Sequence, residues 1–207
     1  AFVRDLRPCA CGEPCACYSR AFMRPSSSQF LTPRLVVLAA GHFTIDAYSS
    51  FFLPLLPLLA ARLGLNYAMV GGLTAMASLS SSFSQPLFGL FADRMRRPWF
   101  VALGPLIAAV FMASIGLAPS YTALVALLVL GGVGVAMFHP QTASLAGVSS
   151  PHRTLAMSFW VTGGTLGWAL GPAYATAVVG QFGLAHTWLA AIPGLVVCAL
   201  LFAWFAR

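Results

Sequence analysis

Apolar residues fill six stretches of the chain, and each is long enough to cross a lipid bilayer as a helix. One crossing needs about 20 predominantly apolar residues, and short connections rich in Gly, Pro, Ser or Arg separate the stretches. The pattern therefore predicts an all-α, polytopic membrane protein that is a bundle of six transmembrane helices. The expected spans are Leu35–Leu59, Tyr67–Phe91, Trp99–Leu117, Tyr121–Ala143, Leu155–Val179 and Thr187–Phe205.

These spans divide the chain into two parts. Residues 35–207 form the expected transmembrane domain, and residues 1–34 precede it as a cytoplasmic extension that we expect to be disordered. The extension contains CACGEPCAC at residues 9–17, whose spacing could bind a soft metal. Common zinc sites place their cysteine pairs further apart, so we interpret the segment instead as an extension or a mis-assigned start ahead of Met23. We expect no metal site and no cofactor.

The charge distribution agrees with a membrane protein and not with a nucleic-acid-binding protein. Charged residues make up 7% of the 207 residues and hydrophobic residues 59%, whereas soluble domains carry about 25% charged residues. All eleven basic residues are arginines, and all but Arg62 fall on one side of the predicted bundle. The positive-inside rule assigns that side, which holds both termini, to the cytoplasm.

One span carries polar residues where an apolar helix would have none. His42 and Asp46 are four residues apart in GHFTIDAYSSFF, so they share a helix face, which Ser49 and Ser50 continue. A charged side chain at the centre of a bilayer costs roughly 2.5–3.5 kcal/mol on insertion scales. We therefore expect this face to turn towards the bundle interior or a water-filled cavity.

Polar residues in two other spans belong to the same predicted cavity. The fourth span contains His139 and Gln141 on either side of Pro140, and the second contains a serine run that ends in Gln85. Aromatic residues could line such a cavity too, although packing explains each of them equally well. These aromatic residues are Phe43, Tyr48, Trp160 and Trp168.

The connection after the second span resembles the cytoplasmic loop signature of the major facilitator superfamily. In GLFADRMRRP the matching residues are Gly89, Asp93, Arg94 and Arg97. Two signature positions differ, because an arginine replaces the second glycine and a proline replaces the last basic residue. The resemblance implies a cytoplasmic gate loop in which a carboxylate and arginines change partners between two states.

The fifth span resembles the helix-five signature of antiporters in that superfamily. GGTLGWALGP places Gly163, Gly167 and Gly171 four residues apart, and Pro172 follows. The resemblance implies a glycine–proline interface between the two halves of a transporter. A close-packed, kinked helix with no further role would show the same spacing.

Two stretches together resemble one branch of the superfamily, the fosmidomycin-resistance-type efflux permeases. They are GHFTIDAYSSFFLPLLP and AMFHP. The resemblance implies a protein of the bacterial inner membrane that exports small drugs or metabolites. Its partners would be the lipid bilayer, a small-molecule substrate and protons. Such transporters have twelve spans in two six-helix halves, so we expect this chain to be the N-terminal half, either as a fragment or paired with a second chain.

Within that expectation we assign Asp46 as the proton carrier, His42 as its partner and His139 as a second candidate. A uniporter or importer of the same fold would have the same sequence pattern. An intramembrane enzyme that uses these three residues is disfavoured, because H-x3-D matches none of the metalloprotease motifs. A fourth alternative is a structural pair that holds two helices together without titrating.

Overall fold

A computed structural model describes residues 31–205 and shows helices joined by short connections, with no strand in that range. The extension at residues 1–30, with its four cysteines, lies outside the described residues. Three of the long helices begin at a residue whose side chain accepts a hydrogen bond from the first turn: Thr32, Asn66 and Ser120. The elements are α2 (Pro33–Ser50), η1 (Leu53–Leu55), α3 (Leu56–Leu63), α4 (Tyr67–Arg94), α5 (Phe100–Ala113), η2 (Ser114–Leu117), α6 (Tyr121–Gly147), α7 (Arg153–Phe182), η3 (Leu184–Ala190) and α8 (Ala191–Phe205).

The first predicted span is continuous in the sequence pattern but broken in the structure. Helix α2 ends at Ser50, and the 3₁₀ turn η1 joins it to α3. Pro54 and Pro57 explain the break, because each lacks the N–H that an α-helix needs for its backbone hydrogen bond. Gly64 then ends α3 in the left-handed region, at φ 63°. The polar residues of this span therefore lie on α2, ahead of the break.

Four segments are long and apolar enough to cross a membrane: Pro33–Leu63, Phe100–Leu117, Tyr121–Gly147 and Leu184–Phe205. Helices α4 and α7 have 28 and 30 residues, which is about 42–45 Å at 1.5 Å per residue. They are long enough to cross, but the serines of α4 and the glycines of α7 lower their hydropathy. Together the six segments form a polytopic helical membrane fold.

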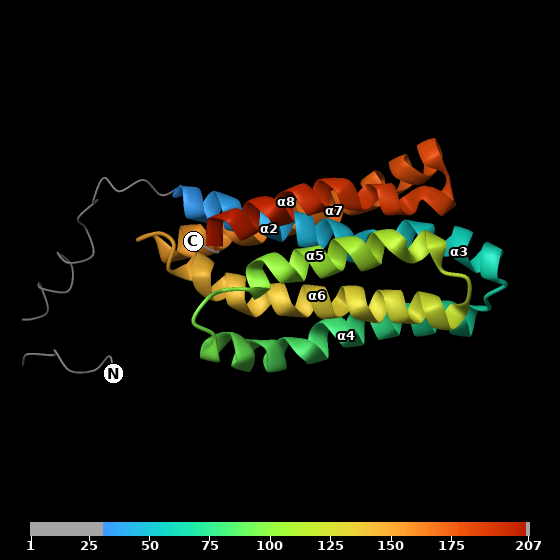
Figure 1. The fold of residues 1–207 in the computed structure, drawn as a ribbon, viewed down its shortest axis with the longest axis horizontal. Helices are drawn as coiled ribbons and strands as arrows, with labels where there is room; N and C mark the ends of the chain where they lie inside the picture. The colour runs from blue at the N-terminus through green and yellow to red at the C-terminus, as the bar shows by residue number, and fades with distance from the viewer. Residues whose placement is uncertain (1–30, 206–207) are drawn as a thin grey trace, which may run out of the picture.

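The helices lie roughly side by side in an elongated bundle (Figure 1). Helix α2 packs against α7, whereas α4 packs against α6, and α5 packs against both α6 and α8. The start of α2, the end of α8 and the connections 95–99 and 148–152 lie at one end of the bundle, on the left in Figure 1. That end carries the arginines which the positive-inside rule assigns to the cytoplasm.

The contact between α2 and α7 is close because glycines line it. A Cβ atom added at Gly163 would lie 2.8 Å from the carbonyl oxygen of Ala39, and one at Gly167 would lie 2.7 Å from the carbonyl carbon of Phe43. Gly171 meets Ala47 in the same way, four residues further along both helices. The glycines that the sequence analysis assigned to an interface between halves thus pack inside this bundle. This close approach brings α7 to the polar residues of α2.

Candidate functional site

Asp46 lies between two histidines that come from different helices. Its Oδ2 is 3.3 Å from Nε2 of His42, one turn earlier on α2, and its Oδ1 is 3.2 Å from Nε2 of His139 on α6. The two imidazole rings are edge to face, with centroids 5.1 Å apart. The structure thus joins the three residues into one group, which we call the His–Asp–His cluster.

Backbone carbonyls fix the orientation of both imidazole rings. Nδ1 of His42 is 2.8 Å from the carbonyl oxygen of Trp160, and Nδ1 of His139 is 2.8 Å from that of Val135. A carbonyl oxygen only accepts hydrogen bonds, so each Nδ1 carries its hydrogen. Each Nε2 is therefore left to share a proton with the carboxylate of Asp46.

The proton count of the cluster follows from these partners. Each contact between Nε2 and a carboxylate oxygen needs one hydrogen, since two facing acceptors repel. With both hydrogens present, two imidazolium groups flank one carboxylate and the cluster keeps a single net positive charge. When one proton leaves, the cluster is neutral and one of the two contacts must open or admit another donor. The number of bound protons is thereby linked to the geometry between α2 and α6.

Helix α7 supplies the third side of the cluster. The indole of Trp160 stacks on the imidazole of His42 with centroids 3.8 Å apart and planes 21° apart. Gly164, one turn later, leaves the space that both polar residues occupy, because a Cβ atom there would lie 2.5 Å from His42 and 2.6 Å from Asp46. The indole Nε1 of Trp160 is buried without a hydrogen-bond partner among the described residues. The sequence predicted Trp160 only as a possible cavity residue, and it gave no sign of the role of Gly164.

The described helices enclose most of the cluster. The side chain of His42 is 6% exposed, whereas Asp46 and His139 are 17% and 21% exposed. Asp46 and His139 are therefore the two members of the cluster that the described helices do not fully cover.

The other predicted cavity residues lie in different places. Ser49 lines a separate pocket with serines of α4. Ser50 is buried against Gly171 of α7, and its hydroxyl donates to the carbonyl oxygens of Asp46 and Ala47. Gln85 is partly buried on α4 and does not line the pocket of Ser49.

Gln141 lies with residues of the predicted gate loop, towards the end of the bundle that carries the arginines. Its side-chain Oε1 accepts a hydrogen bond of 3.2 Å from the backbone N–H of Val101. It lines a pocket of about 330 Å³ that also contains Asp93, Arg34 and Arg96.

Helix α4 continues through two of the gate-loop residues, Asp93 and Arg94, before the chain turns. Gly89 lies one turn earlier and faces Pro140 of α6, where an added Cβ atom would make an ordinary contact at 3.6 Å. Arg97 is exposed in the connection to α5. The gate loop thus begins as the last turn of a helix.

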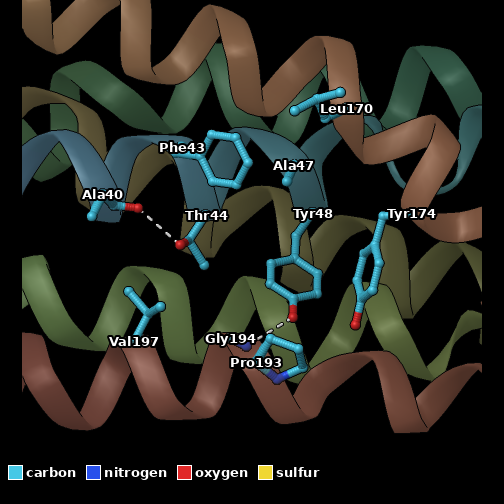
Figure 2. Close-up of a pocket in the computed structure, with 10 residues that line it drawn as sticks. All are labelled: Ala40, Phe43, Thr44, Ala47, Tyr48, Leu170, Tyr174, Pro193, Gly194 and Val197. Carbon is cyan, nitrogen blue, oxygen red and sulfur yellow. Dashed lines mark hydrogen bonds between the residues drawn. The ribbon is translucent and has the colours of Figure 1, made fainter.

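A larger, apolar pocket of about 450 Å³ lies between α2, α7 and α8 (Figure 2). Its polar groups are already paired, because Thr44 donates to the carbonyl oxygen of Ala40 and both tyrosines, Tyr48 and Tyr174, donate to that of Ala190. Figure 2 shows the two tyrosines side by side with their hydroxyl groups turned towards α8. We interpret this pocket as a packing gap on an outer face, since it offers a polar ligand no free partner.

Tyr48→Phe is expected to destabilise the bundle by about 1–3 kcal/mol, the usual cost of an unpaired buried polar group. The hydroxyl of buried Tyr48 accepts a 3.0 Å hydrogen bond from the N–H of Gly194. That N–H is in the first turn of α8 and has no partner within the helix. Thermal unfolding of the purified protein in lipid nanodiscs measures the loss. The matched control, Tyr174→Phe, should cost less, because the carbonyl oxygen of Ala190 still accepts the hydrogen bond from Tyr48.

The His–Asp–His cluster is also the group of described residues that could hold a metal ion. One ligand atom from each of the three residues lies within 4.8 Å of the others. The spacing of 3.2–3.3 Å between each nitrogen and its oxygen is that of a hydrogen bond through a shared proton. The same three side chains thus offer either shared protons or a set of metal ligands.

Comparison with known proteins gives a family-level match. The family model described as "Major Facilitator Superfamily" matches residues 38–207. The chain is 30% identical over 176 residues to the fosmidomycin resistance protein of Escherichia coli (strain K12), which covers 83% of this chain and 43% of that protein. It is 27% identical over 146 residues to the quinolone resistance protein NorA of Staphylococcus aureus, which covers 69% of this chain and 37% of that protein. The chain thus spans less than half the length of these relatives.

A solved structure has the same fold. A bacterial homologue of the human lysosomal transporter Spinster, in an inward-facing and occupied conformation, superimposes with a TM-score of 0.74 at 18% sequence identity. The superposition covers 86% of this chain and 45% of that chain. At this level of identity the match establishes the arrangement of helices and not the substrate.

Proposed function

Because the chain belongs to the major facilitator superfamily, we propose that it is the N-terminal half of a proton-coupled transporter that exports small drugs or metabolites. The observation that carries the proposal is the contact of Asp46 with two histidines from different helices. The second six-helix half would come from the same gene or from a second chain. We place the transporter in the bacterial inner membrane with both termini in the cytoplasm.

Proton coupling follows from the chemistry of the cluster. Histidine ordinarily changes its charge between pH 5 and 8, and here each imidazole can exchange a proton with the carboxylate between them. Loss of one proton opens either the contact of Asp46 with His139, which joins α2 to α6, or its contact with His42 within α2. Two protonation states would therefore favour two arrangements of helices, as alternating access requires.

The cytoplasmic end supplies a second element that could change partners. The carboxylate of Asp93 and the guanidinium groups of Arg34 and Arg96 line one pocket at that end. Ion pairs at an exposed surface are weak, so a helix end of the second half could replace one partner by another. We propose that this pocket acts as the cytoplasmic gate.

Export is supported by the relatives. Two of them are named for resistance to fosmidomycin and to quinolones. Resistance is the result expected when a transporter removes a drug from the cell. Fosmidomycin is accordingly the first substrate to test with this chain.

We expect a pH gradient to drive export in proteoliposomes that contain both halves of the transporter. Radiolabelled fosmidomycin should accumulate in the acidic compartment against its own gradient, because protons leave that compartment as the substrate enters it, and an ionophore that collapses the pH gradient should stop accumulation. A chelator should have no effect, because protons and not a metal occupy the cluster. Equilibration of the substrate without accumulation, unchanged by the ionophore, would identify a uniporter, and loss of transport on chelation would identify a metal-dependent protein.

A further inference from the structure

The His–Asp–His cluster brings together three side chains of the kinds that bind transition metals. His42 and Asp46 come from α2 and His139 comes from α6, and one ligand atom from each lies within 4.8 Å of the others. The H-x3-D spacing alone matches none of the metalloprotease motifs, and it does not reveal the third residue, so the sequence predicted no metal site. The packing of α6 beside α2 supplies that third residue.

Both histidines are held in the tautomer that a metal ligand needs. Nδ1 of His42 donates its hydrogen to the carbonyl oxygen of Trp160, at 2.8 Å. Nδ1 of His139 donates to the carbonyl oxygen of Val135, also at 2.8 Å. Each Nε2 therefore presents its lone pair to the centre of the cluster once the shared proton has left. Histidines that bind metal ions almost always donate their other ring N–H in this way, which fixes the orientation of the ring.

The distances within the cluster also suit a tetrahedral ion. Zinc binds imidazole nitrogen and carboxylate oxygen at about 2.0–2.2 Å, which places neighbouring ligand atoms of a tetrahedron about 3.3–3.6 Å apart. Nε2 of His42 is 3.3 Å from Oδ2 of Asp46, and Nε2 of His139 is 3.2 Å from Oδ1. The cluster thus holds its nitrogen and oxygen atoms at nearly the separations that such an ion needs.

A divalent ion would leave the charge of the cluster unchanged. Two imidazolium groups and one carboxylate carry a single net positive charge. A divalent ion bound by two neutral imidazoles and one carboxylate carries the same charge, so one ion takes the place of two protons. Bound metal and shared protons exclude each other, and protons therefore occupy the cluster when no transition-metal ion is present.

The types of ligand select among metal ions. Calcium takes about six to eight oxygen ligands, and magnesium needs a near-ideal octahedral shell, whereas this cluster offers one carboxylate and two imidazoles. Imidazole suits zinc, copper, iron and nickel. Three protein ligands leave the fourth position of a tetrahedral ion to water or another small ligand. The matching ion is therefore a divalent transition-metal ion.

From these observations we propose that the His–Asp–His cluster is a binding site for a divalent transition-metal ion such as Zn²⁺. The ion replaces both shared protons, and α2 and α6 hold it together. This inference concerns binding alone and goes beyond the proposed transport function. It stands or falls without any measurement of transport.

Titration of Zn²⁺ into the complete protein in lipid nanodiscs at neutral pH, followed by calorimetry, tests the proposal. The four cysteines at residues 9–17 are changed to serine, and the affinity tag contains no histidine, so that neither competes for the ion. The isotherm should contain a saturable site. Asp46→Asn on α2 and His139→Gln on α6 should each weaken this site at least about tenfold, because loss of even a hydrogen-bond partner of a ligand costs about 10–100-fold.

His186→Gln is the matched control, because exposed His186 lies outside the cluster. It should retain the affinity of the wild-type protein. The absence of a saturable site, or an affinity that either ligand variant leaves unchanged, would overturn the proposal.

Two further measurements separate loss of the site from loss of the fold. Zn²⁺ should raise the unfolding temperature of the wild-type protein and of His186→Gln, since a ligand that binds only the folded state stabilises it. The unfolding temperature of Asp46→Asn should stay unchanged. Co²⁺ in place of Zn²⁺ should give the wild-type protein the intense visible absorption bands of four-coordinate cobalt. A spectrum that remains the weak one of aqueous Co²⁺ would overturn the assignment.

Discussion

Asp46→Asn is expected to abolish export that is driven by a pH gradient and to leave the folded transporter in place. Asparagine has the shape of aspartate, and its amide can donate to one histidine and accept from the other, so the contacts within the cluster persist. The amide has no titratable proton at physiological pH, and the carrier group is lost. Initial rates of fosmidomycin accumulation in proteoliposomes should fall to those of vesicles without a gradient.

Two measurements separate coupling from folding in this variant. Exchange of labelled for unlabelled substrate at equal pH should continue, because alternating access itself does not require the gradient. Asp46→Glu is the matched control, since it keeps a titratable carboxyl group at the same position of α2 and should retain part of the coupling. If Asp46→Asn still accumulates substrate against its gradient, Asp46 is not the proton carrier.

The cluster shows how far sequence reasoning reaches. The spacing of His42 and Asp46 predicted one polar helix face, because four residues return a helix to the same side. The participation of His139 was a candidate only, because 93 positions separate it from Asp46 and no periodic pattern spans that distance. Trp160 and Gly164 carried no signal of their own role, since a stacked indole and a space-making glycine look like ordinary packing residues.

The helix boundaries show a second limit. Hydropathy predicted six spans and the structure has six helical segments over residues 31–205, yet the first span is broken after Ser50. Apolar character does not distinguish an α-helix from a 3₁₀ turn, and the two prolines that cause the break are common in transmembrane helices. Residues such as Asp93 were predicted to lie in a loop and occur in the last helical turn, because polarity marks the membrane surface and not the helix end.

The glycine spacing of α7 predicted a close helix contact but not its partner. Spacing by four marks one face of a helix, and any neighbour with small residues could meet it. The structure identifies α2 as that neighbour, through Ala39, Phe43 and Ala47. His42 donates its hydrogen bond to Trp160 across the same contact. Helix packing and the proposed proton site therefore both depend on the distance between the backbones of α2 and α7.

Gly167→Ala is therefore expected to damage both stability and coupling. The added methyl group would overlap the backbone of Phe43, with 2.7 Å to its carbonyl carbon and 2.9 Å to its Cα. A backbone cannot rotate away as a side chain can, so α2 and α7 must separate. We expect a loss of about 3 kcal/mol, the upper part of the usual range for overpacking, measured by thermal unfolding in nanodiscs.

Gly180→Ala is the matched control on the same helix. No atom lies within 4 Å of a Cβ added there, so the variant should keep the stability of the wild-type protein or gain up to about 1 kcal/mol from helix propensity. Gly167→Ala should also weaken gradient-driven export in the fraction that remains folded, because separation of the helices stretches the bond from His42 to Trp160. If Gly167→Ala unfolds at the wild-type temperature and retains full coupling, then α2 and α7 are further apart in the membrane than this contact requires.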